Sequence, residues 1–569
     1  MSDQTYLNPV HQHDAADPFV LKYCGEYWCY CSGIEADGRA FGVLHSHDLV
    51  NWHRLGGALA LLPGNHACYW APEVTYDNGR FLIYYSVGDG TAMEIRVAIA
   101  SQPAGPFVDS GRRLTSEPFA IDAHVFTDDD GRRYLFYATD YPNHARVGTG
   151  TAFDRLIDPL TLAGDPHPVT RAQYEWQVFD PNRAERGGVK WHTIEGSFVL
   201  KRRRRYYQMF SGSNWTNPSY GVSYAIADAL DGSQEWRQVA NGEQVLPILR
   251  TIPGSVIGPG HNSVVRGPDN IQPYCVYHRW AADRSGRQLV IDWLDWAGER
   301  MLVVGPSATP QPLPNRPTTS DRFTHELSAS RWARMTGEWR AEGVAAVQAS
   351  TTGVAAMRCT ADTACFVAEV SLRALAGAGG YGIALEAADG TSVTALIESA
   401  QRRVRVGAVA EYVPLAPQFD PACFHLLRAE VNAGRVALVL DGLPIWRGAA
   451  AARTIALHTE DQAAAFAGFD LTTGYEDLFD IDTPALAGWT SAAGVWQVEA
   501  QSLRANAAAG EALAFKHVLA LGDSEIVVSA CFTDTTTNGV YGIFPAATAA
   551  DPGQLVAVAR HGAGLLHLK

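Results

Sequence analysis

The sequence lacks the long apolar segments that membrane proteins and exported precursors carry. No run of 18 apolar residues occurs, and the first ten residues, MSDQTYLNPV, show no basic start followed by an apolar stretch. A transmembrane helix needs about 20 mostly apolar residues, and a signal peptide needs an apolar core. We therefore expect a cytoplasmic protein without a membrane partner.

Paired cysteines are also absent. The nine cysteines are an odd number, and no two of them form a CxxC pair. A disulfide framework uses an even number of cysteines, and a cysteine-type zinc site uses close pairs. The pattern therefore predicts buried, reduced thiols.

Basic residues are few relative to acidic ones. The chain has 45 Lys and Arg against 60 Asp and Glu, a formal net charge of −15. This charge would repel a nucleic-acid backbone or an anionic membrane, so a neutral substrate fits better. The basic run 201–205 separates two apolar segments, 197–200 and 206–210, and is interpreted as the exposed turn of a hairpin.

What is present is a turn-rich, aromatic sequence with a repeat in its first 300 residues. The chain has 53 Gly and 30 Pro, and helical periodicity is missing between the repeats. Each repeat opens near a polar or acidic residue, passes through a β-rich strand and a turn, and returns through an aromatic-rich strand. The five copies span residues 17–33, 72–88, 122–140, 195–213 and 262–280. Their spacing suits four-stranded blades, which predicts a five-bladed β-propeller.

The innermost strands of a propeller line one central channel, so equivalent positions at their starts should converge. We expect the converging positions to be Asp17, Glu73, Asp122, Glu195 and His261. A single acidic residue at a strand start is usually a turn cap, but several in register across a repeat favour a site. Carboxylates held together raise one another's pKa, so one can act as an acid while another acts as a base.

These segments resemble glycoside hydrolase family 43, the five-bladed pentosidases, over about residues 8–305. The resemblance depends on five motifs in order: ADPFV at 16–20, WAPEV at 70–74, IDAHV at 121–125, IEGS at 194–197 and GHNS at 260–263. Many relatives have Glu-Gly-Pro where this chain has Glu195-Gly196-Ser197. That difference affects the strand start and leaves the acid itself in place.

The resemblance implies an inverting mechanism with three carboxylates. It places the general base on Asp17, the general acid on Glu195 and the residue that orients and tunes the acid on Asp122. Inversion needs the acid and base carboxyl groups about 6.5–9.5 Å apart, with room for a water. Asp14 is an alternative base, less favoured because Asp17 begins the Asp-Pro step of the family pattern.

Further site residues follow from the same resemblance. Arg287 matches an arginine that the family directs into its active site, and Trp70 is the best candidate for stacking on a sugar. The predicted substrate-binding residues are Trp70, Glu73, Arg287, Trp215 and His278, with Trp28 and Tyr220 as lesser candidates for the pocket wall. No cofactor is expected to be required. His261 could hold an axial water or a structural calcium ion, most simply through water, because calcium prefers oxygen ligands. Zinc at His11 and His13 is a less favoured alternative.

The remaining 250 residues contain a second repeat. Phe323, Trp332 and Trp339 recur as Phe479, Trp489 and Trp496. The predicted organisation is a catalytic propeller over 1–305, a linker over 306–320, a β-sandwich over 321–476 and a shorter second copy over 477–569. The sandwiches resemble jelly-roll or lectin-like modules, with carbohydrate binding or a structural lid on the propeller funnel as their roles. The truncated copy would leave an open edge, so it could pair with its neighbour or in a homo-oligomer.

The sequence thus predicts an all-β, exo-acting, inverting glycoside hydrolase. Its expected reaction removes a terminal pentose, α-L-arabinofuranose or β-D-xylose, from a small oligosaccharide. Two alternatives stay open: an exo-galactofuranosidase, because furanoses of five and six carbons present similar ring faces, and a non-catalytic sugar-binding propeller.

Overall fold

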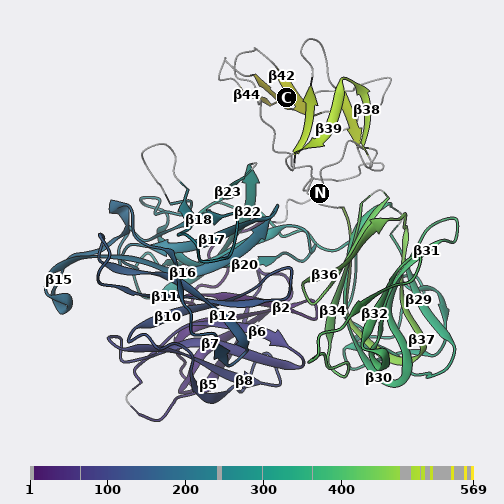
Figure 1. The fold of residues 1–569 in the computed structure, drawn as a ribbon, viewed down its shortest axis with the longest axis horizontal. Coiled ribbons are helices and arrows are strands. Elements are labelled where there is room, and N and C mark those ends of the chain that lie inside the picture. Colours follow the sequence, from purple (N-terminus) through teal and green to yellow (C-terminus); the bar gives the residue numbers. More distant parts are fainter. Residues whose placement is uncertain are drawn as a thin grey trace.

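The computed structural model describes residues 5–64, 66–239, 247–297, 299–361, 363–432 and 434–474, and six short strand segments after residue 488. Strands dominate this part of the chain (Figure 1). Among these residues, no helix has the length and apolar character that crossing a bilayer requires.

Five blades of antiparallel strands make up the described part of residues 19–303, which confirms the predicted propeller (Figure 1). The first two blades are β2 (Phe19–Tyr23), β3 (Glu26–Ile34), β4 (Arg39–Ser46) and β5 (His53–Ala60), then β6 (Cys68–Asp77), β7 (Arg80–Gly88), β8 (Met93–Ala100) and β9 (Val108–Arg113). The third contains β10 (Ala120–Thr127), β11 (Arg133–Tyr141), β12 (Gly148–Asp158), β13 (Thr161–Leu162) and β14 (His167–Thr170). The last two are β16 (Val189–Arg202), β17 (Arg205–Gly212), β18 (Gly221–Ala227) and β19 (Arg237–Gln238), then β20 (Ile257–Arg266), β21 (Pro273–Trp280), β22 (Arg287–Ala297) and β23 (Arg300–Val303).

The hydrophobic core of the propeller lies between neighbouring blades. Alternation along each strand turns apolar side chains to both faces of a blade, so every blade packs against two neighbours. Each interface has its own core cluster with residues from both blades. From the first interface to the fifth these clusters include Phe41 and Tyr85, Leu82 and Leu135, Phe126 and Tyr206, Met209 and Tyr277, and Val20 and Val276. Because the fifth blade packs against the first, the ring is closed.

The N-terminal segment reinforces that closure. The backbone N–H groups of Val10 and Ala15 donate to the carbonyls of Leu289 (2.9 Å) and Arg287 (2.6 Å) on β22. The short strand β1 (Thr5–Tyr6) pairs with β24 (Gln311–Pro312), which lies within the segment predicted as a linker. Residues 10–15 are therefore held along the fifth blade.

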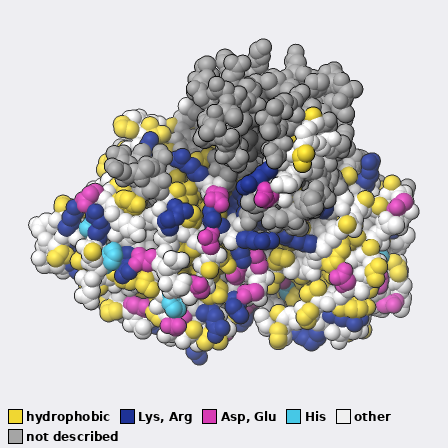
Figure 2. Space-filling view, turned by 45° about the horizontal axis from the view of Figure 1, so that its top comes forward, with side chains coloured by type: hydrophobic (Ala, Val, Ile, Leu, Met, Phe, Trp, Pro, Cys, Tyr) yellow, Lys and Arg dark blue, Asp and Glu magenta, His cyan; other side chains and the backbone are white. Residues whose placement is uncertain are grey.

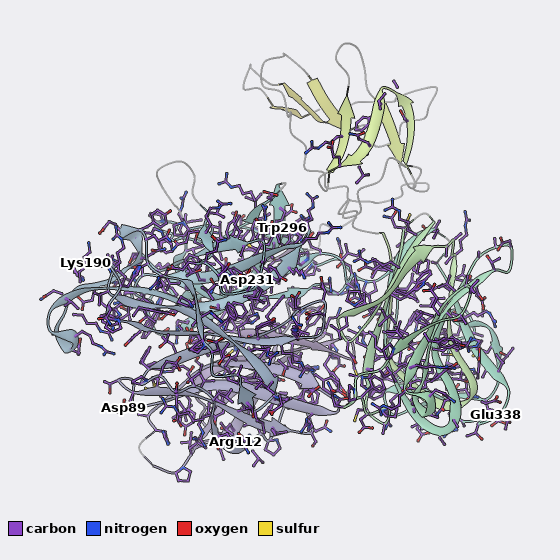
Figure 3. All side chains as sticks on the ribbon, in the orientation of Figure 1. Asp89, Arg112, Lys190, Asp231, Trp296 and Glu338 are labelled. Carbon is purple, nitrogen blue, oxygen red and sulfur yellow. The ribbon has the colours of Figure 1, made fainter. Side chains whose placement is uncertain are left out.

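A hairpin projects from the side of the propeller between the third and fourth blades. It contains η1 (Glu175–Gln177), β15 (Val178–Arg183) and η2 (Ala184–Arg186), with β15 paired to the start of β16. Lys190 lies on this projection (Figure 3) and forms an ion pair with Glu175. The hairpin is on the side of the propeller away from the strands that follow residue 319 (Figure 1).

The strands from residue 319 to 473 form one thirteen-stranded antiparallel sheet, called the second sheet below. Its strands are β25 (Thr319–Asp321), β26 (Ala333–Thr336), β27 (Trp339–Glu342), β28 (Ala345–Gln348), β29 (Val354–Thr360), β30 (Cys365–Glu386), β31 (Ser392–Glu398), β32 (Arg403–Gly407), β33 (Glu411–Pro414), β34 (His425–Asn432), β35 (Arg435–Leu440), β36 (Leu443–Ala449) and β37 (Thr454–Thr473), with η3 (Ser399–Gln401) after β31. It has its own core, which includes Trp332, Phe366, Tyr381, Phe466 and Phe469.

The predicted second copy over 477–569 lies mostly outside the described residues. Within it the structure describes β38 (Trp489–Ala493) with β41 (Leu513–Lys516), β39 (Val495–Glu499) with β40 (Ser502–Asn506), and the set β42 (Val540–Ile543), β43 (Ala557–Arg560) and β44 (Leu566–Leu568). The sandwich and lectin-like character of the two copies stays a prediction.

The second sheet contacts the turns that follow the inner strands of the propeller. Arg322 Nη2 donates to the Gly25 carbonyl (3.0 Å), the Asp420 N–H donates to Asn78 Oδ1 (3.0 Å), and Arg428 Nη1 donates to the Asn270 carbonyl (2.8 Å). These turns lie at the opposite end of the inner strands from the acidic residues. For the second sheet, the predicted role of a lid over the acidic end is therefore wrong, because this sheet contacts the other end of the channel.

This junction contains a buried ion pair. Arg428 Nη1 lies 2.6 Å from Glu369 Oε1, and both side chains are less than a tenth exposed. The Arg428→Met variant would leave the Glu369 carboxylate buried without its partner, which typically costs about 3–5 kcal/mol. We expect a clearly lower midpoint of thermal and urea unfolding.

The control for this variant is Arg340→Met, which removes an exposed pair with Glu342. It should change the free energy of unfolding by at most about 1 kcal/mol. Equal effects of the two variants would show that the buried pair does not stabilise the junction.

Elsewhere on the surface, basic and acidic side chains are interspersed over the described part of the face in Figure 2.

Candidate active site

A residue in the left-handed backbone region lies within each of the inner strands β6, β10, β16 and β20, and just before β2. These residues are Asp17 (φ 49°), Ala71 (φ 45°), Asp122 (φ 60°), Gly196 (φ 63°) and His261 (φ 46°). In the last four blades the pairing register of the inner strand slips at this point, as in a β-bulge. Glu73 and Glu195 are therefore not equivalent to Asp17, contrary to expectation. Glu73 lies two residues after the equivalent position, and Glu195 lies one residue before it. Ala71 and Gly196 occupy the equivalent places.

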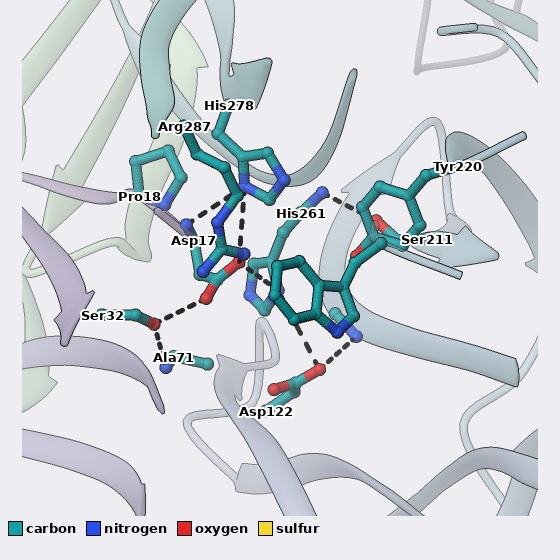
Figure 4. Close-up of polar contacts among 12 residues, drawn as sticks. Asp17, Pro18, Ser32, Ala71, Asp122, Ser211, Tyr220, His261, His278 and Arg287 are labelled. Carbon is teal, nitrogen blue, oxygen red and sulfur yellow. Dashed lines mark hydrogen bonds and ion pairs between the residues drawn. The ribbon is translucent and has the colours of Figure 1, made fainter. Parts of the chain in front are cut away.

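The backbone N–H group of each of these five residues donates a hydrogen bond to a side chain. They donate from Asp17 to His278 Nδ1 (3.1 Å), from Ala71 to Ser32 Oγ (2.7 Å), from Asp122 to Ser86 Oγ (2.9 Å), from Gly196 to Asp122 Oδ2 (2.9 Å) and from His261 to Ser211 Oγ (2.7 Å). In four cases the acceptor is a side chain on the second strand of the preceding blade. Figure 4 shows several of these contacts.

The Gly196 amide is the exception, and Ala138 explains it. Ala138 pairs with Ile121 in the third blade, as Ser86 pairs with Trp70 in the second and Ser211 with Glu195 in the fourth. An alanine side chain has no acceptor, so the Gly196 N–H turns to the Asp122 carboxylate instead. The carboxylate of Asp122 is thereby drawn to the residue next to Glu195.

The Asp17 carboxylate is stabilised in its ionised form by a neighbouring cation, Arg287. Its Oδ1 accepts from Arg287 Nη1 (2.8 Å), and its Oδ2 accepts from the Ser32 hydroxyl (2.6 Å) (Figure 4). Burial opposes ionisation, but Arg287, with smaller contributions from His261, His278 and the Ser32 hydroxyl, holds the pKa of Asp17 below its usual value. Asp17 is therefore ionised at neutral pH.

Glu195 has the opposite environment. Burial, reinforced by the charge of Asp17, raises its pKa to about 7, although the hydrogen bond from Tyr220 and the charge of Arg287 act the other way. The Tyr220 hydroxyl donates to Glu195 Oε1 at 2.9 Å. A carboxyl group with this pKa is about half protonated at pH 7 and mostly protonated below it, so it can serve as a general acid.

The pKa of Asp122, rather than that of Glu195 alone, is raised by the neighbouring carboxylates. Burial and the charges of Glu195 and Asp17 raise the pKa of Asp122 well above its usual value, and the Gly196 amide only partly opposes this. The like-charge effect expected on Glu195 therefore falls chiefly on Asp122 itself. The structure brings the three predicted carboxylates together, with one ionised and two that favour protonation.

Arg287 and Trp215, two of the predicted substrate-binding residues, lie beside this group. The Arg287 guanidinium lies 4.8 Å over the Trp215 ring, which stacks on Trp280 at 5.8 Å. Trp215 is 37% exposed, so part of its surface is open to solvent. Trp70 packs near Ile121 and Ala138, next to Asp122, and is only partly buried.

Two other predicted substrate-binding residues are committed to protein contacts. The Glu73 carboxylate accepts from the Val125 N–H (2.7 Å) and lies 2.8 Å from His124 Nδ1, so both of its oxygens are used between the second and third blades. His278 is fully buried, accepts the Asp17 N–H and stacks on Tyr220. Its burial lowers its pKa well below the usual value, so the ring is neutral. Both residues position others rather than face a substrate.

His261 lies over the channel between two of the carboxylates. Its Nδ1 is 3.6 Å from Asp17 Oδ1 and 3.9 Å from Asp122 Oδ2, and burial lowers its pKa. The cavity beside it is also lined by Asn262, whose buried Oδ1 has no hydrogen-bond partner among the described residues. Oxygen donors of this kind suit water or a hard cation such as calcium.

The role of Tyr220 was missed by sequence reasoning. The sequence predicts Tyr220 only as a lesser candidate for the pocket wall, yet its hydroxyl donates to Glu195. It lies on the loop before β18, and 25 residues separate it from Glu195. No local pattern links the two, because the contact depends on how the fourth blade folds back on itself.

Comparison with known proteins identifies relatives for the first half of the chain. The sequence model described as "Glycosyl hydrolases family 43" matches residues 6–301. Beta-D-galactofuranosidase xynD of Aspergillus niger is 29% identical over 316 residues, with 51% of this chain and 80% of that protein covered. Alpha-L-arabinofuranosidase 43 of Humicola insolens is 26% identical, with 51% and 58% covered.

A solved structure was also found. A crystal structure described as a thermostable family-43 glycoside hydrolase has 31% sequence identity and a TM-score of 0.48, with 55% of this chain and 99% of that chain covered.

Proposed function

The chain belongs to glycosyl hydrolases family 43, and from this we propose that it is an inverting, exo-acting glycosidase that releases terminal α-L-arabinofuranose or β-D-xylose from short oligosaccharides. The observation that carries the proposal is the division among the buried carboxylates. Arg287 keeps Asp17 ionised, while burial raises the pKa of Glu195 to about 7. An acid and a base in one pocket are what inversion requires.

In the proposed mechanism Glu195 donates its proton to the leaving oxygen as the glycosidic bond breaks. Asp17 takes a proton from a water that attacks the anomeric carbon from the opposite face of the sugar. Asp122 stays close to Glu195 through the Gly196 amide and orients the acid. Trp215 and Trp70 supply apolar ring surface for the sugar.

A second candidate substrate is a terminal galactofuranose. It is favoured by the relative from Aspergillus niger, whose name is that of a galactofuranosidase. The same acid and base would serve either furanose, because both present a similar ring to the pocket.

The resemblance also allows either a water or a structural calcium ion in the channel. Asn262 Oδ1 and the Asp17 and Asp122 carboxylates would hold the ion, with His261 contacting it through water. When bound, the ion would supply positive charge that favours ionised carboxylates.

Hydrolysis of a panel of aryl glycosides tests the proposal. We expect activity on the α-L-arabinofuranoside, β-D-xyloside or β-D-galactofuranoside, with the inverted anomer as the first product detected by NMR. A retained anomer would contradict the roles given to Asp17 and Glu195. A failure to hydrolyse any of the panel, with sugar still bound in calorimetry, would favour the non-catalytic sugar-binding propeller.

The pH profile tests the acid directly. Activity should fall as pH rises through about 7, because Glu195 then loses its proton. In Tyr220→Phe the hydrogen bond that stabilises the ionised form is lost, so the pKa of Glu195 should rise and the alkaline limb should move up by about half to one pH unit. The phenyl ring can still stack on His278. An unchanged alkaline limb would show that another group controls it.

Ala138→Ser tests how Asp122 is held. A hydroxyl at position 138 would offer the Gly196 N–H the acceptor that serine supplies in three other blades. Asp122 would lose its direct hydrogen bond, and we expect kcat to fall about ten- to a hundredfold through misplacement of the pair. Ala138→Cys is the matched control, because it adds bulk but only a weak acceptor. Equal losses in both variants would assign the effect to packing.

A further inference from the structure

A second group of ligand-type side chains lies on the first blade, away from the acidic centre. Glu26 begins β3, His45 is on β4, and His47 follows the last residue of β4. The register pairs Trp28 with His45 and Tyr27 with Ser46, so Glu26 lies opposite His47 and all three side chains share one face. Opposite positions on antiparallel strands bring side chains within contact distance.

The distances between the ligand atoms of Glu26, His45 and His47 are close to those found around a bound metal ion. Glu26 Oε2 is 3.0 Å from His45 Nε2, and Glu26 Oε1 is 3.4 Å from His47 Nδ1. One ligand atom from each residue lies within 4.8 Å of the other two. Around a tetrahedral Zn²⁺ with bonds of about 2.0–2.2 Å, ligand atoms are about 3.3–3.6 Å apart. Small side-chain rotations would complete that arrangement.

Of the two histidines in the group, His45 is held by packing and His47 is exposed to solvent. The His45 ring packs on Trp28 at 4.5 Å and on His47 at 4.8 Å, and only 18% of its side chain is exposed. The His47 side chain is 67% exposed, so an ion could reach the site from solvent. His53 pairs with His45 across β4 and β5 and is exposed, which places a third imidazole on the same face.

We propose that Glu26, His45 and His47 bind a divalent transition-metal ion such as Zn²⁺. Two imidazole nitrogens and one carboxylate suit zinc, cobalt, nickel or copper better than calcium or magnesium. The Gly25 carbonyl, one residue before Glu26, accepts from Arg322 of the second sheet. A bound ion would therefore brace the turn on which the second sheet rests, and its effect should be on stability rather than on catalysis.

Titration of the chelator-treated full chain with Zn²⁺ tests this site. Calorimetry should show one equivalent bound, and Co²⁺ should give the visible absorption of a tetrahedral site with nitrogen and oxygen ligands. The thermal midpoint should rise with Zn²⁺, because an ion that binds only the folded chain stabilises it. Absence of binding by the unmodified protein would overturn the proposal.

Two variants assign the binding to these residues. His47→Ala and Glu26→Gln should each weaken Zn²⁺ binding at least about tenfold and remove the Co²⁺ absorption. His167→Ala is the control, because His167 lies near a single carboxylate, that of Asp165, at 3.4 Å. Binding that survives in His47→Ala and Glu26→Gln, or is lost equally in His167→Ala, would overturn the assignment.

Discussion

Glu195→Gln should lower kcat on an unactivated disaccharide by about a hundred- to ten-thousandfold, the usual contribution of a general acid. Glutamine keeps the shape of the side chain and can still accept from Tyr220, but it has no proton of suitable pKa to donate. The sugar should still bind, since Arg287, Trp215 and Asp17 are unchanged. Steady-state kinetics and calorimetric binding measured on the same preparation check both parts.

The leaving group distinguishes an acid from any other role of Glu195. A nitrophenolate departs without needing a proton, so Glu195→Gln should lose much less activity on the nitrophenyl glycoside than on the disaccharide. Glu175→Gln, at an exposed carboxylate on the projecting hairpin, serves as the control and should keep activity on both. An equal loss on the two substrates in Glu195→Gln would contradict the assignment of Glu195 as the acid.

Asp17→Asn should lower kcat by a similar or larger factor on every substrate, because the attacking water loses its base. Here the quality of the leaving group should make little difference, in contrast to Glu195→Gln. The variant also leaves Arg287 without the carboxylate that its Nη1 contacts at 2.8 Å. Its thermal midpoint and its sugar affinity should therefore be measured beside the kinetics.

Asp14→Asn is the matched variant for this test. Asp14 was the competing candidate for the base, and its Oδ1 accepts the backbone N–H of Arg287 at 2.7 Å. It lies on the backbone side of Arg287, while Asp17 contacts the guanidinium. We expect Asp14→Asn to keep most of kcat. A greater loss in Asp14→Asn than in Asp17→Asn would exchange their roles.

The propeller and its acidic residues were predictable because the repeat is local. Each copy contains its own strand, turn and aromatic return, and the motifs assign Asp17, Asp122 and Glu195 to three different inner strands. The exact register was not predictable, because a bulge adds one residue to the inner strand and short strands contain too few alternating positions to locate it. For that reason Glu73 was grouped with the site, although Ala71 holds the equivalent position.

The sequence by itself determined that five blades repeat and which three carboxylates lie on or beside the inner strands. Only the tertiary structure decided what surrounds them. Asp17 meets Arg287 across 270 residues because the ring closes between the first and last blades. Likewise, the second sheet covers the far end of the channel through contacts with turns hundreds of residues away. Burial and charge partners arise from such long-range packing, so the pKa values that separate the acid from the base depend on the closed ring.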